Sequence, residues 1–156
     1  MSAAWFLTRS PDSFVYVYEP LGFNIERLRQ NLARFEGRYK LHPIAVGTTN
    51  GTVEFGWEET GRYGGVGMKT GNYISVPCVD SNTVLGEAIA KHGGIDILKI
   101  DIETMERELT ERIPFEFAKH IQRIYVEKSF DPNPLGRTHD YRQYGSVAQF
   151  TLRGGN

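Results

Sequence analysis

Acidic side chains follow the ends of apolar runs at three points along the chain. Asp101 and Glu103 end the run that begins near Ile97, Glu127 ends the run 121–126, and Glu19 ends the run 14–18. Runs rich in β-branched and aromatic residues predict strands, and ligands of open α/β sheets bind beyond the carboxyl ends of the strands. Since carboxylates at such an edge cost desolvation energy unless something pairs with them, we expect a shared acidic edge that binds a ligand.

Two structural interpretations of these acids stay open. If 96–103 is one strand, Lys99, Asp101 and Glu103 share a face, so Lys99 can pair with Asp101. Glu103 would then cap the helix predicted over 105–112, because acids favour helix N-termini. Alternatively, all the strand-end acids are solvated charges without a common role.

The position of Glu19 indicates a nucleoside ligand. An acid that ends the second strand of a nucleotide-binding α/β unit accepts the two ribose hydroxyls of the nucleoside. Glu19, followed by Pro20, fits that position. A dinucleotide dehydrogenase and an S-adenosylmethionine (SAM) enzyme would both use such an acid, so Glu19 alone does not choose between them.

The elements that must position these acids alternate along the chain. Apolar periodicity and breaker residues predict helices over 2–8, 24–35, 84–91 and 105–112, a further helical turn over 115–120 and a weak helix over 135–144. Strands are predicted over 14–18, 41–46, 73–79, 96–103, 121–127 and 146–152, with a hairpin between Val46 and 53–55 and a helix cap within 81–83. The glycine-rich stretch 56–71 is expected to be a mobile loop that closes over a substrate. This alternation predicts an α/β fold with a parallel βαβ sheet.

Length and composition exclude several classes of protein. The chain has 156 residues, enough for one domain with a core, and a net charge of −1, which gives no electrostatic drive for nucleic-acid binding. No apolar run is long enough to cross a membrane. The single cysteine, Cys78, rules out an internal disulfide and fits a reducing compartment, so we expect a cytoplasmic protein. The four histidines lack metal-ligand spacing, and no metal site is predicted.

The residue pattern resembles the FkbM-type methyltransferases over about 1–130. Val-Tyr-Val-Tyr-Glu-Pro at 15–20 resembles that family's second strand, and Leu-Lys-Ile-Asp-Ile-Glu at 98–103, with Glu106, resembles its most recognisable motif. Asp80 matches an aspartate usual in the family. The resemblance implies a single Rossmann-like class I methyltransferase domain with a doubly wound, mostly parallel sheet. It also implies SAM as methyl donor and a small-molecule acceptor, such as a sugar hydroxyl.

Site residues follow from the resemblance by position. Glu19 and Pro20 would hold the cofactor ribose, and Ala45 and Val46 would lie beside the adenine. Asp101 would lie near the methionine part of SAM, and Glu103 and Glu127 would face the acceptor. We predict no other catalytic or cofactor-binding residues.

Two departures from the family pattern stand out. Thr104 occupies the place of a glycine after the motif glutamate, so the backbone path into the next helix is expected to differ. The family's first strand and glycine-rich cofactor loop have no counterpart, because Met1 to Phe6 resembles the helix that follows them. We therefore expect the chain to be an N-terminally truncated part of a longer reading frame.

The chemistry needed at the acidic edge can be stated from the acids themselves. A hydroxyl that accepts a methyl group must lose its proton, and a carboxylate crowded by other carboxylates has a raised pKa and can take it. A divalent cation held by the acids would be an alternative; the base is favoured because no Asn or second Asp completes a metal shell. Two other functions stay open: a nicotinamide-dependent oxidoreductase, although no Tyr-x-x-x-Lys relay is present, and a non-catalytic binding module.

Overall fold

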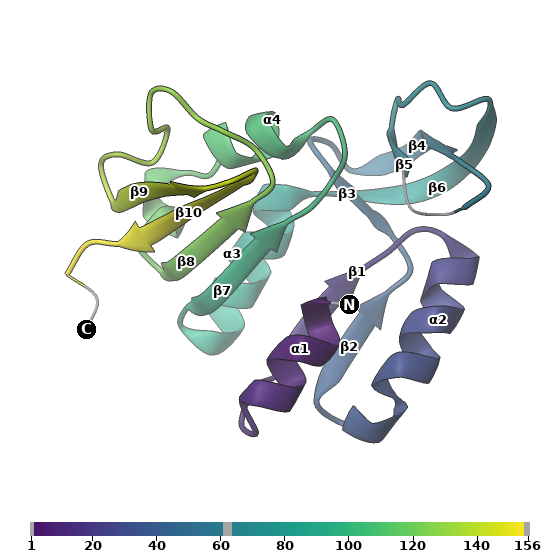
Figure 1. The fold of residues 1–156 in the computed structure, drawn as a ribbon, viewed down its shortest axis with the longest axis horizontal. Helices are drawn as coiled ribbons and strands as arrows, with labels where there is room; N and C mark the ends of the chain where they lie inside the picture. Colours follow the sequence, from purple (N-terminus) through teal and green to yellow (C-terminus); the bar gives the residue numbers. More distant parts are fainter. Residues whose placement is uncertain (1, 61–63, 155–156) are drawn as a thin grey trace. The chain divides into compact units, whose positions relative to one another are not determined.

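The computed structural model describes residues 2–60 and 64–154 (Figure 1). The described residues form two compact units: unit 1 holds 2–46, 51–60 and 64–78, and unit 2 holds 47–50 and 79–154. The elements that begin in unit 1 are α1 (Ser2–Arg9), β1 (Val15–Tyr18), α2 (Gly22–Leu32), the 3₁₀ helix η1 (Ala33–Phe35), β2 (Tyr39–His42), β3 (Ala45–Gly47), β4 (Gly51–Trp57), β5 (Gly64–Val66) and β6 (Asn72–Asp80). Those of unit 2 are α3 (Ser81–His92), β7 (Ile95–Ile100), α4 (Glu106–Glu111), α5 (Phe115–Ala118), β8 (Ile121–Val126), β9 (His139–Tyr144) and β10 (Val147–Leu152).

Unit 1 contains two small sheets. Strands β1 and β2 pair in parallel, and α1 and α2 lie alongside them (Figure 1). Alternation along β1 places Val15 and Val17 against a buried cluster of Leu7, Leu32 and Phe35. The second sheet has the strand order β3-β6-β4-β5 and its own buried cluster of Leu21, Ala45, Phe55, Val76 and Cys78. Cys78 is thus a buried member of this core.

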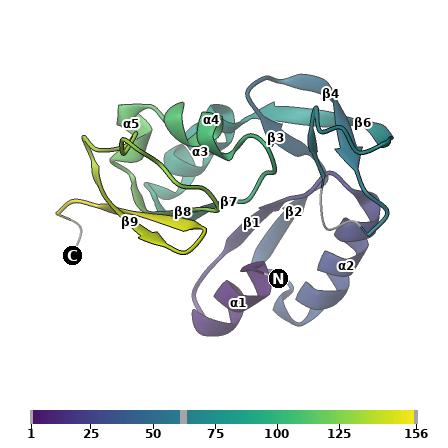
Figure 2. The same cartoon turned by 45° about the horizontal axis from the view of Figure 1, so that its top comes forward.

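Unit 2 is one sheet with helices on one side. The strand order is β7-β8-β10-β9, with β7 and β8 parallel and the other pairs antiparallel. Figure 2 shows α3, α4 and α5 on the same side of these strands. Their apolar residues join those of the strands in one core, which contains Leu85, Ile100, Leu109, Ile113, Ala118, Ile121, Ile124, Val126, Phe130, Leu135, Ala148 and Phe150.

The fold is mixed α/β, but the expected doubly wound, mostly parallel sheet is not confirmed. Parallel pairing is seen for β1 with β2 and for β7 with β8, whereas β4 pairs with β5 and β6, and β10 with β8 and β9, in antiparallel fashion. Short connections explain the difference, since β9 and β10 are joined through Gly145, whose φ of 58° suits a tight hairpin turn.

Three local predictions in unit 1 are wrong. The run 41–46 is two strands in different sheets, because Pro43 interrupts the chain between β2 and β3. The predicted hairpin of Val46 with 53–55 does not form, since β4 pairs with β6 from Gly51↔Cys78 to Trp57↔Asn72. The stretch 56–71 is also not all loop: it includes the end of β4 and all of β5, while residues 61–63 lie outside the described part.

Gly56 shows why glycine is needed within that stretch. A Cβ atom at this position would lie 1.9 Å from the Met68 carbonyl oxygen, so a larger residue would push the two segments apart. The glycine-rich composition here serves close backbone packing at least at this position. Closure over a substrate stays a prediction.

Three predictions in unit 2 are also corrected. Residues 135–144 are not helical, because β9 pairs along its whole length with β10, and tertiary pairing overrides a weak local propensity. The strand predicted over 96–103 ends at Ile100, so Asp101 and Glu103 follow it. The cap of α3 is Asp80 rather than a residue of 81–83, since its Oδ1 accepts the Asn82 backbone N–H at 2.8 Å.

No helix in the described part of the chain is both long enough and apolar enough to cross a membrane.

Candidate functional site at the strand ends

The carboxyl ends of β7 and β8 bring three of the predicted acids to one edge of unit 2. The parallel register pairs Ile100 with Val126, so the segments that follow both strands leave the sheet side by side. Asp101 and Glu103 follow β7, and Glu127 follows β8. The predicted acidic edge therefore exists for these three residues. Glu19 belongs to unit 1, and its place at a common edge stays a prediction.

Glu103 is a strand-end acid whose pKa is raised. Partial burial raises its pKa above the usual 4.5, and the negative charges of Glu106, Asp101 and Glu127 raise it further, in that order. Lys128 acts in the opposite direction. These interactions define one group of side chains, hereafter the acid cluster: Asp101, Glu103, Glu106 and Glu127. Its raised pKa makes Glu103 a better proton acceptor than an ordinary glutamate.

Asp101 forms the ion pair that the structural interpretation anticipated. Its Oδ2 accepts a hydrogen bond from the Lys99 Nζ, and the two side chains are 47% and 36% exposed. An ion pair this exposed contributes little to stability. Glu103, in contrast, does not cap the next helix: α4 has Met105 as its N-cap and no side-chain capping bond.

Thr104 explains how the chain passes from Glu103 into α4. Its φ of 76° lies in the left-handed region that glycine adopts freely and a β-branched residue adopts at a cost. The backbone thus takes the conformation that a glycine at this position would favour, despite the substitution. The expectation that the path differs from that of the family stays a prediction.

Glu106 is the member of the cluster that the sequence interpretation left without a role. It lies at the start of α4 and is only 6% exposed, and its Oε2 has no hydrogen-bond donor among the described residues. Its helical spacing to Leu109 and Thr110, both buried, is the signal that could have predicted this burial.

Glu127 connects the cluster to the hairpin of β9 and β10. Its Oε1 accepts a hydrogen bond of 3.4 Å from the Ser146 hydroxyl, which is long and exposed. The side chain therefore keeps most of its capacity to accept bonds from a ligand.

Glu19 lies at the end of β1 in a different environment. Its Oε1 accepts the Leu21 backbone N–H at 2.9 Å. Burial raises the pKa of Glu19, while the bonds from Leu21 and from the Asn24 side chain partly offset that effect. A carboxylate has about four acceptor positions, so two donors leave room for the paired hydroxyls of a ribose. The donor set fits the predicted role.

The remaining predicted cofactor residues lie in the same unit as Glu19. Ala45 on β3 is buried in the cluster that contains Leu21, so the turn after Glu19 and the start of β3 share one core. Val46 and Pro20 are half-buried. Because the Ala45 side chain is enclosed, any contact of this residue with adenine would use its backbone.

Asp80 has a clear structural role. Besides capping α3, its Oδ2 pairs with the Arg112 guanidinium at 3.0 Å, and its backbone N–H donates to the Asn50 side chain at 2.9 Å. These contacts join α3 to the end of the α4 segment within unit 2. Nothing in them requires a ligand.

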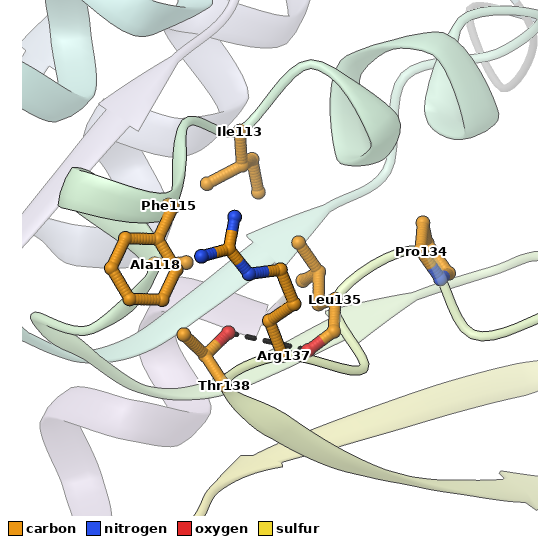
Figure 3. Close-up of a pocket in the computed structure, with 7 residues that line it drawn as sticks. All are labelled: Ile113, Phe115, Ala118, Pro134, Leu135, Arg137 and Thr138. Carbon is orange, nitrogen blue, oxygen red and sulfur yellow. Dashed lines mark hydrogen bonds between the residues drawn. The ribbon is translucent and has the colours of Figure 1, made fainter.

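A small hollow lies elsewhere in unit 2 (Figure 3). It has a volume of about 160 Å³, and the Arg137 guanidinium lies 4.4 Å from the Phe115 ring centre beside it. Its lining consists of Ile113, Phe115, Ala118, Pro134, Leu135, Arg137 and Thr138. No member of the acid cluster contributes to this hollow.

The described residues also contain no group of three or more His, Cys, Asp or Glu side chains arranged to hold a metal ion. The acid cluster is thus a set of carboxylates that act on one another through charge rather than a formed coordination shell.

Comparison with known proteins gives one match. A family model described as the methyltransferase FkbM domain matches residues 5–151, which is nearly the whole chain. Searches of curated proteins and of solved structures give no match.

Proposed function

The chain belongs to the FkbM methyltransferase family, and from that premise we propose that it is a SAM-dependent methyltransferase acting on a hydroxyl of a small metabolite such as a sugar. The observation that carries the proposal is Glu103, a carboxylate surrounded by three others at the ends of two parallel strands. Such a group can take the proton that a hydroxyl must lose when it accepts a methyl group.

The family match supports treating both units as parts of one methyltransferase domain, because it runs through residues of each. Each unit contributes one parallel pair, β1 with β2 and β7 with β8, in separate sheets.

In this proposal Glu19 holds the nucleoside end of the cofactor. Its carboxylate is fixed by the Leu21 N–H and keeps free acceptor positions for the two ribose hydroxyls. Pro20, Ala45 and Val46 would line the adjacent surface. When bound, SAM would supply a methyl group attached to a positively charged sulfur. Loss of the methyl group converts that sulfonium into a neutral thioether.

The acid cluster handles the acceptor. Glu103 accepts the hydroxyl proton as the new oxygen–carbon bond forms, and Glu127 orients the acceptor by accepting a second hydrogen bond. Asp101, whose charge Lys99 partly compensates, would lie near the methionine part of SAM, as the family resemblance implies. A base is favoured over a cation because the neighbouring carboxylates raise the pKa of Glu103.

The test is to titrate S-adenosylhomocysteine and NAD separately against the purified chain by calorimetry. We expect S-adenosylhomocysteine to bind and NAD not to bind. Tight NAD binding without binding of S-adenosylhomocysteine would favour an oxidoreductase, and binding of neither would favour a non-catalytic module. A second step incubates the chain with methyl-labelled SAM and a metabolite extract, and methylated products identify the acceptor class.

A further inference from the structure

Glu106 has a buried side-chain oxygen that receives no hydrogen bond from the described residues. The residue is 94% buried, and no described donor reaches its Oε2. Thr110 donates to the backbone carbonyl of Glu106 at 2.7 Å rather than to the side chain. A buried carboxylate oxygen without a partner is costly, since it has lost its hydration and gained nothing in return.

The neighbours of Glu106 increase that cost. Glu103 lies close enough for the Glu106 charge to act on it more strongly than any other charge does, and Asp101 and Glu127 add to the same negative region. The two nearby cations do not balance it: Lys99 pairs with Asp101, and Lys128 offsets only part of the charge felt by Glu103. The chain itself therefore leaves an excess of negative charge beside a buried, unpaired oxygen.

The chemistry of a suitable ligand group follows from these two facts. It must donate hydrogen bonds to Oε2, and it must carry positive charge to offset the carboxylates. A hydroxyl meets the first condition only, and a phosphate or carboxylate meets neither. A protonated primary amine meets both, because it has three donors and a unit charge.

We infer that Glu106, with Glu103 beside it, binds a primary ammonium group of a ligand. The inference rests on the proposed function for the identity of that ligand, which has two possible sources: an amine-bearing methyl acceptor, or the amino-acid part of the cofactor. In either case Glu106 makes a direct contact, and acceptors that place a phosphate or carboxylate here are rejected.

The experiment measures binding by amide chemical shifts of unit 2 for two matched pairs of probes. Glucosamine is compared with glucose, which replaces the ammonium by a hydroxyl. S-adenosylhomocysteine is compared with methylthioadenosine, which lacks the amino-acid part. Each is titrated into the unaltered chain, Glu106→Gln and the control Glu108→Gln, an exposed acid on the same helix.

The expected result is that the ammonium member of one pair binds about ten-fold or more tightly than its neutral counterpart. Glu106→Gln should remove that preference and Glu108→Gln should keep it. Preference within the sugar pair assigns the ammonium to the acceptor, and preference within the nucleoside pair assigns it to the cofactor. The inference is wrong if neither pair shows a preference in the unaltered chain, a comparison that needs no variant to fold.

Failure of this inference differs from failure of the proposed function. Suppose that S-adenosylhomocysteine binds, but that no preference for an ammonium-bearing probe is lost in Glu106→Gln. The methyltransferase proposal then stands and the inference is wrong. If S-adenosylhomocysteine does not bind but glucosamine is preferred through Glu106, the ammonium site stands and the methyltransferase proposal falls.

Discussion

Glu19 in unit 1 and Glu103 in unit 2 are both strand-end carboxylates with raised pKa values, but their surroundings differ. Around Glu19, burial raises the pKa while two hydrogen-bond donors, from Leu21 and Asn24, favour the charged form. Around Glu103, burial is reinforced by three negative charges and opposed by Lys128 alone. The first environment suits a fixed acceptor of hydrogen bonds, and the second suits a group that takes up a proton.

The largest effect that would test this contrast is expected for Glu103→Gln. Glutamine cannot take up the proton that the hydroxyl of the methyl acceptor must lose, so the rate of methyl transfer should fall by about 10²–10⁴-fold. The affinity for S-adenosylhomocysteine should stay unchanged. Product formation from labelled SAM measures the rate, and calorimetry measures the affinity for S-adenosylhomocysteine. In the unaltered chain the rate should rise with pH through the raised pKa of Glu103. A full rate in the variant would place the base elsewhere.

Asp101→Asn should reduce turnover by a smaller factor and leave the fold intact. The substitution removes an exposed ion pair, so the free energy of unfolding should change by less than about 1 kcal/mol. Lys99→Gln removes the same pair and serves as the control. Equal loss of turnover in both variants would mean that turnover depends on the Lys99–Asp101 ion pair rather than on the Asp101 carboxylate itself. Unfolding of Asp101→Asn would show that the residue is structural.

Glu19→Ala should weaken S-adenosylhomocysteine binding by roughly 1.5–3 kcal/mol, the scale of hydrogen bonds to a charged group. Glu26→Ala, an exposed acid on the following helix, is the matched control and should have no effect on calorimetric affinity. If Glu19→Ala keeps full affinity but lowers the helicity of the chain, Glu19 serves only to fix the start of α2.

Thr104→Gly should stabilise unit 2 by about 1 kcal/mol. It relieves a left-handed conformation that costs a β-branched residue about 1–3 kcal/mol, and glycine's greater freedom in the unfolded chain offsets part of that gain. Urea unfolding measures the change. Thr104→Ala keeps a Cβ atom and should give no comparable gain. A destabilised glycine variant would mean that the threonine side chain makes a contact worth more than the strain.

The buried His139 adds a pH effect that is confined to unit 2. Its side chain is fully buried, with Nε2 bonded to the Ile121 carbonyl at 2.9 Å and Nδ1 to the Thr138 hydroxyl at 2.8 Å. Burial lowers its pKa below the usual 6.5. As the pH falls below 6.5, the unfolded chain takes up a proton that the folded chain does not, so stability decreases until the folded pKa is reached.

Ring-proton NMR titration checks this prediction. His139 should titrate below the ordinary value of 6.5. Titration of His139 at or above the ordinary value would contradict it.

The sequence was most informative where local pattern and packing agree. The β-branched run 95–100 and the run 121–126 each form a strand whose apolar side chains join one core, so the acids that follow them were placed at the correct edge. Sequence reasoning failed where strand pairing overrides a weak local propensity, as in residues 139–144, which pair with β10 across a tight turn. It assigned no role to Glu106, although Leu109 and Thr110, buried at helical spacing from it, indicate that Glu106 faces the core.

The distribution of the two tryptophans gives this chain a built-in optical label. Trp5 and Trp57 both belong to unit 1, and unit 2 contains neither. Trp57 has a buried indole N–H and lies 5.6 Å from the Phe23 ring, next to the start of α2, whereas Trp5 is 53% exposed. Emission excited at the indole band therefore originates only in the unit that contains Glu19. Quenching by iodide would suppress Trp5 selectively, leaving Trp57 as a single-site fluorophore for nucleoside binding without any added dye.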